Sequence, residues 1–295
     1  MRLYLYIIVL WIISCRMPNQ TKITLMNDLS IVPKPVSTKI LNGKLDLKSI
    51  KGISLKNNSD EERHVAELFQ DYLKPISPIS ISKSLSEANA KHIIIALDSN
   101  SDIPDDGYEL SIDERHFIEL KASSPSGLFY GFQTFRQLCP PELEAGEAPK
   151  NTNLKNCTIV DYPTFGYRGM HLDVSRHFFD VDFVKTYLDM IALHKMNVFH
   201  WHLTDDNGWR IEIDQYPELT AKSAWRVDRR DEHWKEWSPI KPGEKATYGG
   251  FYSKEDVREV IQYAADRNIM VIPEIEMPGH TSEVFAAYPD LSCKG

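Results

Sequence analysis

Apolar residues in the first part of the chain recur three or four positions apart, which is the spacing of one helix face. They are Val65, Leu68, Phe69 and Tyr72. Ser59 and Glu62 precede them in the pattern of a capping box, and Pro75 ends the run. The pattern predicts one amphipathic helix between Ser59 and Pro75.

Short apolar runs follow this helix and are separated by turn residues. They predict β-strands at residues 93–95, 108–112 and 117–120, and a second helix at residues 127–138. Strands and helices mixed in this way are typical of an α+β layer domain.

The segment 140–156 marks the end of that domain in the sequence. It begins with two prolines and continues with acidic and amide residues, and it has too few apolar groups for core packing. We therefore expect an N-terminal α+β domain over residues 31–155 and a second domain over residues 160–295.

In the second domain, three apolar runs alternate with two helical patterns. Strands are expected at residues 170–174, 197–203 and 269–272, and Asp180 and Ser253 cap the helices between them. Strands that alternate with helices pair in parallel.

The same order is that of a parallel β/α barrel, which needs about 250 residues to close with eight strands, whereas roughly 130 follow the boundary. The predicted fold class is α/β, with the α+β domain followed by an incomplete TIM (β/α)8 barrel of about three βα units. Five strands are expected to be lacking.

The chain begins with an apolar run at residues 3–13, which suits the core of a signal peptide and is too short to span a bilayer. It ends in Ile13-Ser14-Cys15, which resembles the processing box of bacterial lipoproteins, with Cys15 as the lipidated residue. A plain secretory signal is the alternative. We expect an exported bacterial protein, in the periplasm or at the cell surface, with residues 16–30 as a polar tether.

The charge of the chain is acidic, with 34 Lys and Arg against 42 Asp and Glu and a formal net charge of −8. Cleavage at this processing box removes Arg2 and no acid, which leaves 33 − 42 = −9. An acidic chain is an unlikely partner for nucleic acid. Three other cysteines lack metal-ligand spacing, and the sequence leaves open whether Cys139 and Cys157 form a disulfide.

Polar residues follow each strand of the second domain. Since active sites of parallel barrels lie at the carboxyl ends of the strands, these residues are expected to meet at one mouth. They are DVSRH at residues 173–177, HWHLTDD at residues 200–206 and PEIEMPGH at residues 273–280.

These three motifs, with RGMHLDVSRHFF at residues 168–179, resemble the family 20 β-N-acetylhexosaminidases. GYEL at residues 107–110 and GLFYGFQT at residues 127–134 resemble the non-catalytic domain that precedes the barrel of this family. The resemblance implies an exo-acting glycosidase that removes terminal N-acetylglucosamine or N-acetylgalactosamine from glycans, without a metal or an organic cofactor.

The resemblance assigns Arg176 to the arginine that binds hydroxyls of the terminal sugar. A planar guanidinium holds two neighbouring hydroxyls at once. The alternative is a scaffold arginine paired with Asp173.

Asp205 and His280 match a pair in which the carboxylate orients the imidazole and the imidazole contacts the catalytic acid. An aspartate in that position fixes the tautomer and favours the imidazolium. His202 and Glu274 are further candidates for the same site.

His200 and His202 alternate with Trp201 and share one face of their strand. Such a pair also begins the zinc site of metal-dependent hydrolases, with Asp205, Asp206 or His280 as further ligands. The resemblance implies a metal-free site instead.

The family's general acid is a glutamate in an Asp-Glu pair after the fourth strand, and no residue here matches that pair. We therefore expect these 295 residues alone to be inactive. In the complete mechanism the 2-acetamido oxygen of the substrate attacks the anomeric carbon with retention. A carbohydrate-binding protein without catalysis and a metal-dependent hydrolase are the alternatives.

Overall fold

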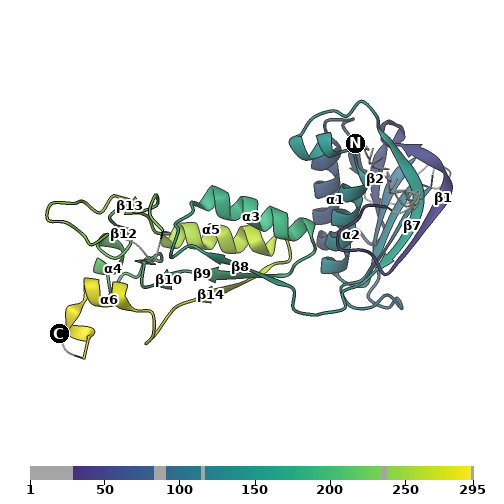
Figure 1. Ribbon diagram of the computed structural model, residues 1–295. Helices are drawn as coiled ribbons and strands as arrows, with labels where there is room; N and C mark the ends of the chain where they lie inside the picture. Colours follow the sequence, from purple (N-terminus) through teal and green to yellow (C-terminus); the bar gives the residue numbers. More distant parts are fainter. Residues whose placement is uncertain (1–28, 83–90, 114–116, 234–237, 294–295) are drawn as a thin grey trace, which may run out of the picture.

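The computed structural model describes residues 29–82, 91–113, 117–233 and 238–293. The two larger sheets, of seven and three strands, lie one after the other along an elongated molecule, and two further sheets have two strands each (Figure 1). The expected signal peptide and Cys15 lie outside the described residues. Among the residues that are described, no helix has the length and apolar character needed to cross a membrane.

The first sheet has seven strands in the order β1-β7-β5-β6-β4-β2-β3. The four strands β1, β7, β5 and β6 pair antiparallel, and β6, β4, β2 and β3 pair in parallel, so the sheet is mixed. Its strands are β1 (Ser37–Asp46), β2 (Gly52–Leu55), β3 (Ser80–Ser82), β4 (His92–Leu97), β5 (Tyr108–Asp113), β6 (Phe117–Ala122) and β7 (Asn153–Asp161).

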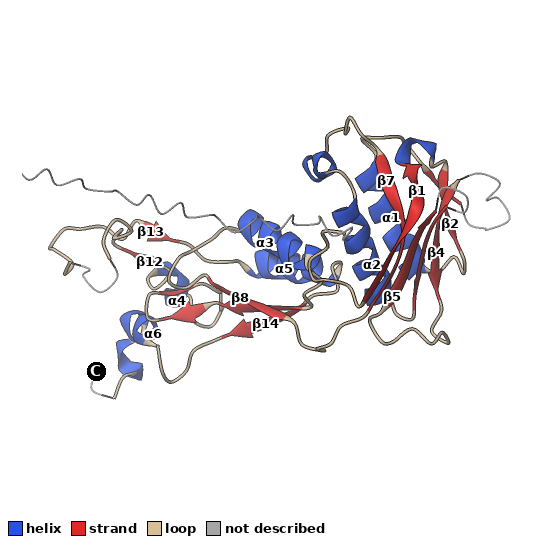
Figure 2. Ribbon diagram, turned by 45° about the vertical axis from the view of Figure 1, so that its right-hand side comes forward, coloured by secondary structure: helices blue, strands red, loops and turns tan. Residues whose placement is uncertain are grey.

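Two helices, α1 (Asp60–Leu73) and α2 (Pro125–Leu138), cover one face of this sheet and pack against each other (Figure 2). Phe69 of α1 meets Phe132 of α2 with ring centroids 4.8 Å apart. Two short 3-10 helices, η1 (Leu47–Ser49) and η3 (Pro141–Ala145), complete the unit. Both expected helices and all three expected strands are present.

The capping box expected at Ser59 is only half formed. The Ser59 hydroxyl accepts a hydrogen bond from the backbone N–H of Glu62. The Glu62 carboxylate does not return to Ser59; it accepts hydrogen bonds from the backbone N–H groups of Asn57 and Leu97, each at 2.9 Å. Glu62 is fully buried, and these bonds satisfy its charge at the ends of β2 and β4.

The expected boundary at residue 155 is too early, because β7 lies inside the first sheet and runs to Asp161. Leu143, in the segment taken to lack core packing, is also buried. Leu154 of the same segment is buried in β7, so two apolar residues of the segment belong to the core. The expected tether ends too late as well, since Leu29 already packs against the core.

Cys139 and Cys157, whose pairing the sequence left open, are both free and buried. Burial raises the pKa of both thiols, to about 11 for Cys157. They behave as small apolar core residues.

The second sheet contains β8 (Gly169–Asp173), β9 (Val198–His202) and β14 (Met270–Glu274), paired in parallel in the order β14-β9-β8. Helices α3 (Val181–Leu193) and α5 (Lys254–Ala265) connect these strands and cover one face (Figure 1). Each strand lies within two residues of its predicted position. The described strands form an open parallel sheet and do not close into a barrel.

Short elements surround the carboxyl ends of these strands. They are β10 (Thr204–Asp205), β11 (Gly208–Trp209), α4 (Glu218–Ala221), β12 (Trp225–Arg226), β13 (Tyr248–Gly249), α6 (Ser282–Ala287) and η5 (Pro289–Leu291). Arg210 is fully buried among them and donates hydrogen bonds to the carbonyls of Val174, Ser175 and Ala224. A buried guanidinium thus fixes the loops that follow β8 and β11.

Candidate active site

The three parallel strands place their polar side chains on one face. Asp173, His202 and Glu274 stand in register at the ends of β8, β9 and β14. Phe199 and Trp201, which alternate with the histidines, are buried on the other face, where Trp201 meets Tyr252 beside α5. The period-2 alternation therefore separates an apolar face under the helices from a polar face.

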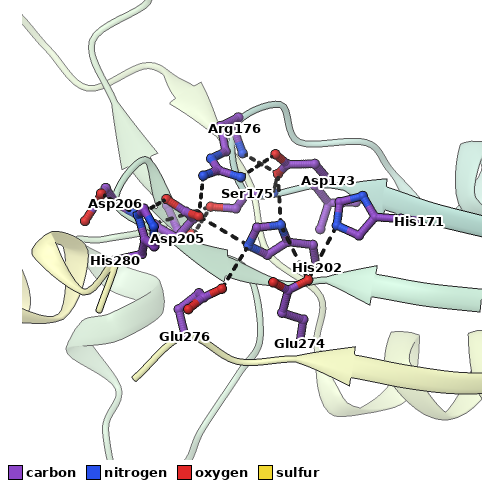
Figure 3. A network of polar contacts seen from close by, with 12 residues as sticks. His171, Asp173, Ser175, Arg176, His202, Asp205, Asp206, Glu274, Glu276 and His280 are labelled. Atoms are coloured by element: carbon purple, nitrogen blue, oxygen red, sulfur yellow. Dashed lines mark hydrogen bonds and ion pairs between the residues drawn. The ribbon is translucent and has the colours of Figure 1, made fainter. Parts of the chain in front are cut away.

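A pocket of about 660 Å³ lies at the carboxyl ends of the strands. Arg176, Asp205 and His280, which the sequence selected, all line it. The structure therefore brings together a cation, a carboxylate and an imidazole from three segments (Figure 3). The other lining residues are Asp173, His177, Asp206 and Asn207.

Arg176 is held by two carboxylates. Its Nη1 lies 2.8 Å from Asp173 Oδ2, and its Nη2 lies 2.5 Å from Asp205 Oδ2. Partial burial lowers the pKa of Arg176, but the pairs with Asp173 and Asp205 outweigh burial and raise it. The side chain remains 40% exposed, so Arg176 is both braced by Asp173 and open to the pocket.

Asp205 is at the centre of the polar contacts and is only 2% exposed. Besides Arg176, its carboxylate lies 3.3 Å from His202 Nε2 and 3.5 Å from His280 Nδ1. The backbone N–H of Asp206 also donates to Asp205 Oδ1. One buried carboxylate thus contacts a guanidinium and two imidazoles.

The expected pair of Asp205 and His280 is present, with His280 Nδ1 3.5 Å from Asp205 Oδ1, and Asp206 is a second and nearer carboxylate partner. His280 Nδ1 lies 3.1 Å from Asp206 Oδ2 and forms a hydrogen bond there. Ser282 holds Asp206 in place, donating from both its backbone N–H and its hydroxyl. The hydrogen bond with Asp206, and then the charge of Asp205, raise the pKa of His280 above its usual value.

The turn that carries His280 has unusual backbone geometry. His280 has φ of +50°, in the left-handed region that non-glycine residues seldom adopt. Its side chain is 57% exposed at the pocket. Strained, exposed residues are common at functional sites.

Below the pocket, three histidines gather around Glu274. Its Oε2 lies 2.7 Å from His200 Nε2, 3.4 Å from His171 Nε2 and 3.7 Å from His202 Nδ1. Burial raises the pKa of Glu274, but a hydrogen bond with Glu276 and the charges of the imidazoles lower it on balance. His200 and His202 therefore share one face, as the sequence predicted.

Sequence reasoning missed three members of this region. Asp206 was considered only as a metal ligand, and His171 and Glu276 were given no role. The signal for His171 was available, because it stands two positions before Asp173 and so shares its face. Glu276 Oε1 lies 4.0 Å from His202 Nε2. Glu276 follows the end of β14, where the alternation of side chains along a strand no longer predicts which face a side chain is on.

Comparisons with known proteins agree in both halves of the chain. Residues 28–162 match the model of glycosyl hydrolase family 20, domain 2, and residues 165–295 match that of glycosyl hydrolase family 20, catalytic domain. The chain is 40% identical over 238 residues to a β-hexosaminidase of Porphyromonas gingivalis, a match that covers 80% of this chain and 29% of that protein. It is 38% identical over 263 residues to a β-hexosaminidase of Vibrio furnissii, covering 89% and 40%.

Solved structures give the same result. The family 20 β-N-acetylhexosaminidase of Streptomyces coelicolor A3(2) superposes with a TM-score of 0.76 at 33% identity, covering 90% of this chain and 49% of that one. The exo β-N-acetylglucosaminidase of Vibrio harveyi, solved with N-acetylglucosamine, has a TM-score of 0.72 at 30% identity, covering 90% and 39%. The chain spans less than half the length of each of these four relatives.

Proposed function

Because this chain belongs to glycosyl hydrolase family 20, we propose that it forms the sugar-binding part of an exo-acting β-N-acetylhexosaminidase. Its substrate would be a glycan that ends in N-acetylglucosamine or N-acetylgalactosamine. The three parallel strands would be the first strands of a (β/α)8 barrel, preceded by the N-terminal α+β domain. The relatives' names and the complex with N-acetylglucosamine support the choice of sugar.

The observation that carries this proposal is the meeting of Arg176, Asp205 and His280 at one pocket. Arg176 would donate hydrogen bonds to hydroxyls of the terminal sugar, with its orientation fixed by Asp173 and Asp205. Hydrogen bonds to a charged group contribute roughly 1.5–3 kcal/mol each, which is enough to select a hydroxyl pattern.

His280 would serve the acid–base step. The hydrogen bond with Asp206 and the charge of Asp205 raise the pKa of His280, which favours its protonated form, and the imidazole would tune a neighbouring catalytic acid. In substrate-assisted retention the nucleophile is the sugar's own acetamide oxygen. Proton transfer to the leaving oxygen then requires a positioned acid.

No residue of this chain matches the Asp-Glu pair that supplies that acid in the family. Glu274 and Glu276 both lie close to His202, below the pocket. We therefore propose that these 295 residues bind the sugar but do not hydrolyse its glycosides. No metal or organic cofactor takes part in the proposed reaction.

The proposed location is outside the cytoplasm, with the protein held at a bacterial membrane by lipid on Cys15. The apolar run at residues 3–13 and the Ile13-Ser14-Cys15 motif support this. The acidic net charge of −8 supports a neutral glycan rather than nucleic acid as partner.

Saturation-transfer NMR with the purified chain tests the function. N-acetylglucosamine should receive magnetisation from the protein, and xylose, which lacks the acetamide and the C6 hydroxyl, should receive much less. An aryl N-acetyl-β-glucosaminide should not be cleaved. Equal transfer to both sugars would argue against the proposed substrate, and cleavage that depends on the protein would refute the absence of the acid.

The same experiment bears on a purely carbohydrate-binding role. This chain is expected to bind a sugar without cleaving it whether it is part of a hexosaminidase or a non-catalytic carbohydrate-binding protein. The two hypotheses differ in the role that they give to His280. In a family member that carries the Asp-Glu pair, replacement of the residue equivalent to His280 should lower turnover and change its pH profile, whereas a binding protein gives no such profile.

A further inference from the structure

Three side chains on neighbouring strands converge on one point below the sugar pocket. They are His171 of β8, His200 of β9 and Glu274 of β14. One nitrogen or oxygen from each lies within 4.8 Å of the other two. Parallel pairing sets this arrangement, because His171 and His200 stand directly opposite each other and Glu274 is two positions beyond Ile272, the residue opposite His200.

The separations suit a transition metal. Tetrahedral zinc binds histidine nitrogen at about 2.0–2.1 Å and carboxylate oxygen at about 2.0–2.2 Å, which places neighbouring ligand atoms roughly 3.3–3.5 Å apart. Glu274 Oε2 lies 3.4 Å from His171 Nε2 and 2.7 Å from His200 Nε2. Of these two separations, the one from His200 has to widen, by less than an ångström, to admit an ion, and the third separation, between the two imidazoles, is within 4.8 Å.

The contacts of Glu274 Oε2 with the histidines do not have the geometry of hydrogen bonds. Its Oε2 is buried, yet no described donor makes a hydrogen bond to it, although His200 Nε2 is 2.7 Å away. A buried carboxylate oxygen of this kind is costly unless a cation compensates it. Imidazole nitrogens that approach the oxygen without directing an N–H at it leave room for a shared ion.

A second buried imidazole lies beside the cluster. His202 is only 4% exposed, and while its Nε2 lies 3.3 Å from Asp205 Oδ2, its other ring nitrogen is on the side of Glu274. Its Nδ1 lies 3.7 Å from Glu274 Oε2, which makes His202 the next nitrogen available to an ion. Its ring centroid is 5.3 Å from that of His171.

One side of the cluster is open to solvent. The side chains of His171, His200 and Glu274 are 45%, 36% and 26% exposed. Three protein ligands with an open fourth position are typical of a zinc site that keeps a bound water. Two imidazoles favour zinc, copper or nickel, whereas magnesium and calcium prefer oxygen ligands alone.

We propose that His171, His200 and Glu274 form a binding site for a divalent transition metal of the zinc class. The site is separate from the residues that line the sugar pocket, and it does not take part in the proposed hydrolysis. It is accessory to the site of Arg176, Asp205 and His280, and it stands whether or not the chain binds a sugar.

The test is calorimetric titration of the metal-stripped chain with zinc chloride, followed by metal analysis after dialysis. One zinc per chain should bind, and millimolar magnesium should not compete. His171→Ala, His200→Ala and Glu274→Gln should each weaken binding at least tenfold. His64→Ala removes a half-buried histidine of α1 and should leave zinc binding unchanged.

A second control separates this site from the other group of acids and histidine, Asp205, Asp206 and His280. Zinc binding that is lost in His280→Ala and kept in His200→Ala would overturn the proposal, as would the absence of binding at 100 μM zinc, a concentration on the order of that used to saturate micromolar sites. If a variant fails to fold, cobalt bound to the unaltered chain gives an independent answer. Its absorption bands should indicate a tetrahedral nitrogen and oxygen site, and octahedral bands would contradict it.

Discussion

Arg176 Nη2 lies 2.5 Å from Asp205 Oδ2, and this contact joins the loop after β8 to the short strand β10 that follows β9. Asp205 is almost fully buried, whereas Arg176 is 40% exposed. The pair therefore has a buried end that anchors it and an exposed end that faces the pocket. Figure 3 shows His202 and His280 on opposite sides of the same carboxylate.

Removal of the Asp205 carboxylate should destabilise the protein. Asp205→Ala leaves the buried His202 and the inner edge of Arg176 without their shared partner. Breaking a buried charged contact typically costs about 3–5 kcal/mol, and partial exposure of Arg176 reduces this to about 2–3 kcal/mol of unfolding free energy. Urea unfolding measures the change.

The matched control is Asp228→Ala, which removes an aspartate paired with Arg230 at the surface. Solvent screens exposed pairs, so this variant should lose much less unfolding free energy than Asp205→Ala. Equal losses of unfolding free energy in the two variants would show that the buried contacts of Asp205 stabilise the protein no more than an exposed ion pair does.

The imidazole of His280 should titrate above its usual pKa, because Asp206 accepts a hydrogen bond from it and Asp205 adds negative charge. NMR titration of the imidazole protons should show this. Asp206→Asn should lower the pKa of His280 towards its ordinary value, and Asp173→Asn, which alters a carboxylate that does not contact His280, should change it less. An unshifted pKa of His280 in the unaltered chain would contradict its hydrogen bond with Asp206.

Glu283 predicts a pH dependence of stability. It is 4% exposed, and burial, with the charges of Asp206 and Asp205, raises its pKa to about 7. A group whose folded pKa lies above its unfolded value stabilises the protein fully below the unfolded pKa, near 4.5, and loses that stabilisation as pH rises through about 7. Unfolding free energy should therefore fall between those values.

Glu283→Gln keeps the shape of the side chain and removes its titration. At pH 8 this variant should be more stable than the unaltered chain, by on the order of 1–3 kcal/mol. Thermal unfolding at pH 5 and at pH 8 makes the comparison. A variant that is less stable at pH 8 would contradict the assigned pKa.

The sequence predicted the central elements because their signals are local. Asp180 and Ser253 cap α3 and α5 as expected, since a cap depends on residues three positions apart. β1 was not predicted, because its Lys, Asn and Gly residues are not typical of a strand. Its pairing with β7 joins residues over a hundred positions apart. Non-local pairing leaves little trace in one strand alone.

The position of the site at the carboxyl ends of the strands was predicted, whereas the contacts between its side chains were predicted less well. Parallel strand ends meet by geometry, so the meeting of Arg176 and Asp205 follows from the order of elements. The choice between Asp205 and Asp206 as partner of His280 depends on the direction of one turn, which spacing does not encode. Glu283 was missed because its neighbours in sequence do not reveal its burial.

A buried ion pair also joins the first sheet to the turn between α3 and β9. Lys195 Nζ lies 2.8 Å from Asp161 Oδ2 of β7 and 2.8 Å from the Tyr108 hydroxyl of β5. Lys195→Met should cost about 2–4 kcal/mol, because it leaves Asp161 buried without its cation. Lys222→Met, which breaks an exposed pair with Glu218, should cost less than about 0.5 kcal/mol. Denaturant unfolding measures the two losses of unfolding free energy. Equal losses in Lys195→Met and Lys222→Met would show that the buried pair of Lys195 and Asp161 does not stabilise the protein more than the exposed pair does.

The central claim is that Arg176 holds a sugar in the pocket that it shares with Asp205 and His280. Calorimetric titration with N-acetylglucosamine tests it most directly, on the unaltered chain, on Arg176→Ala and on Arg258→Ala, a control that removes an exposed arginine of α5. The account predicts an affinity at least tenfold weaker in Arg176→Ala, equivalent to about 1.4 kcal/mol, and unchanged in Arg258→Ala. Equal affinities in all three proteins would contradict it.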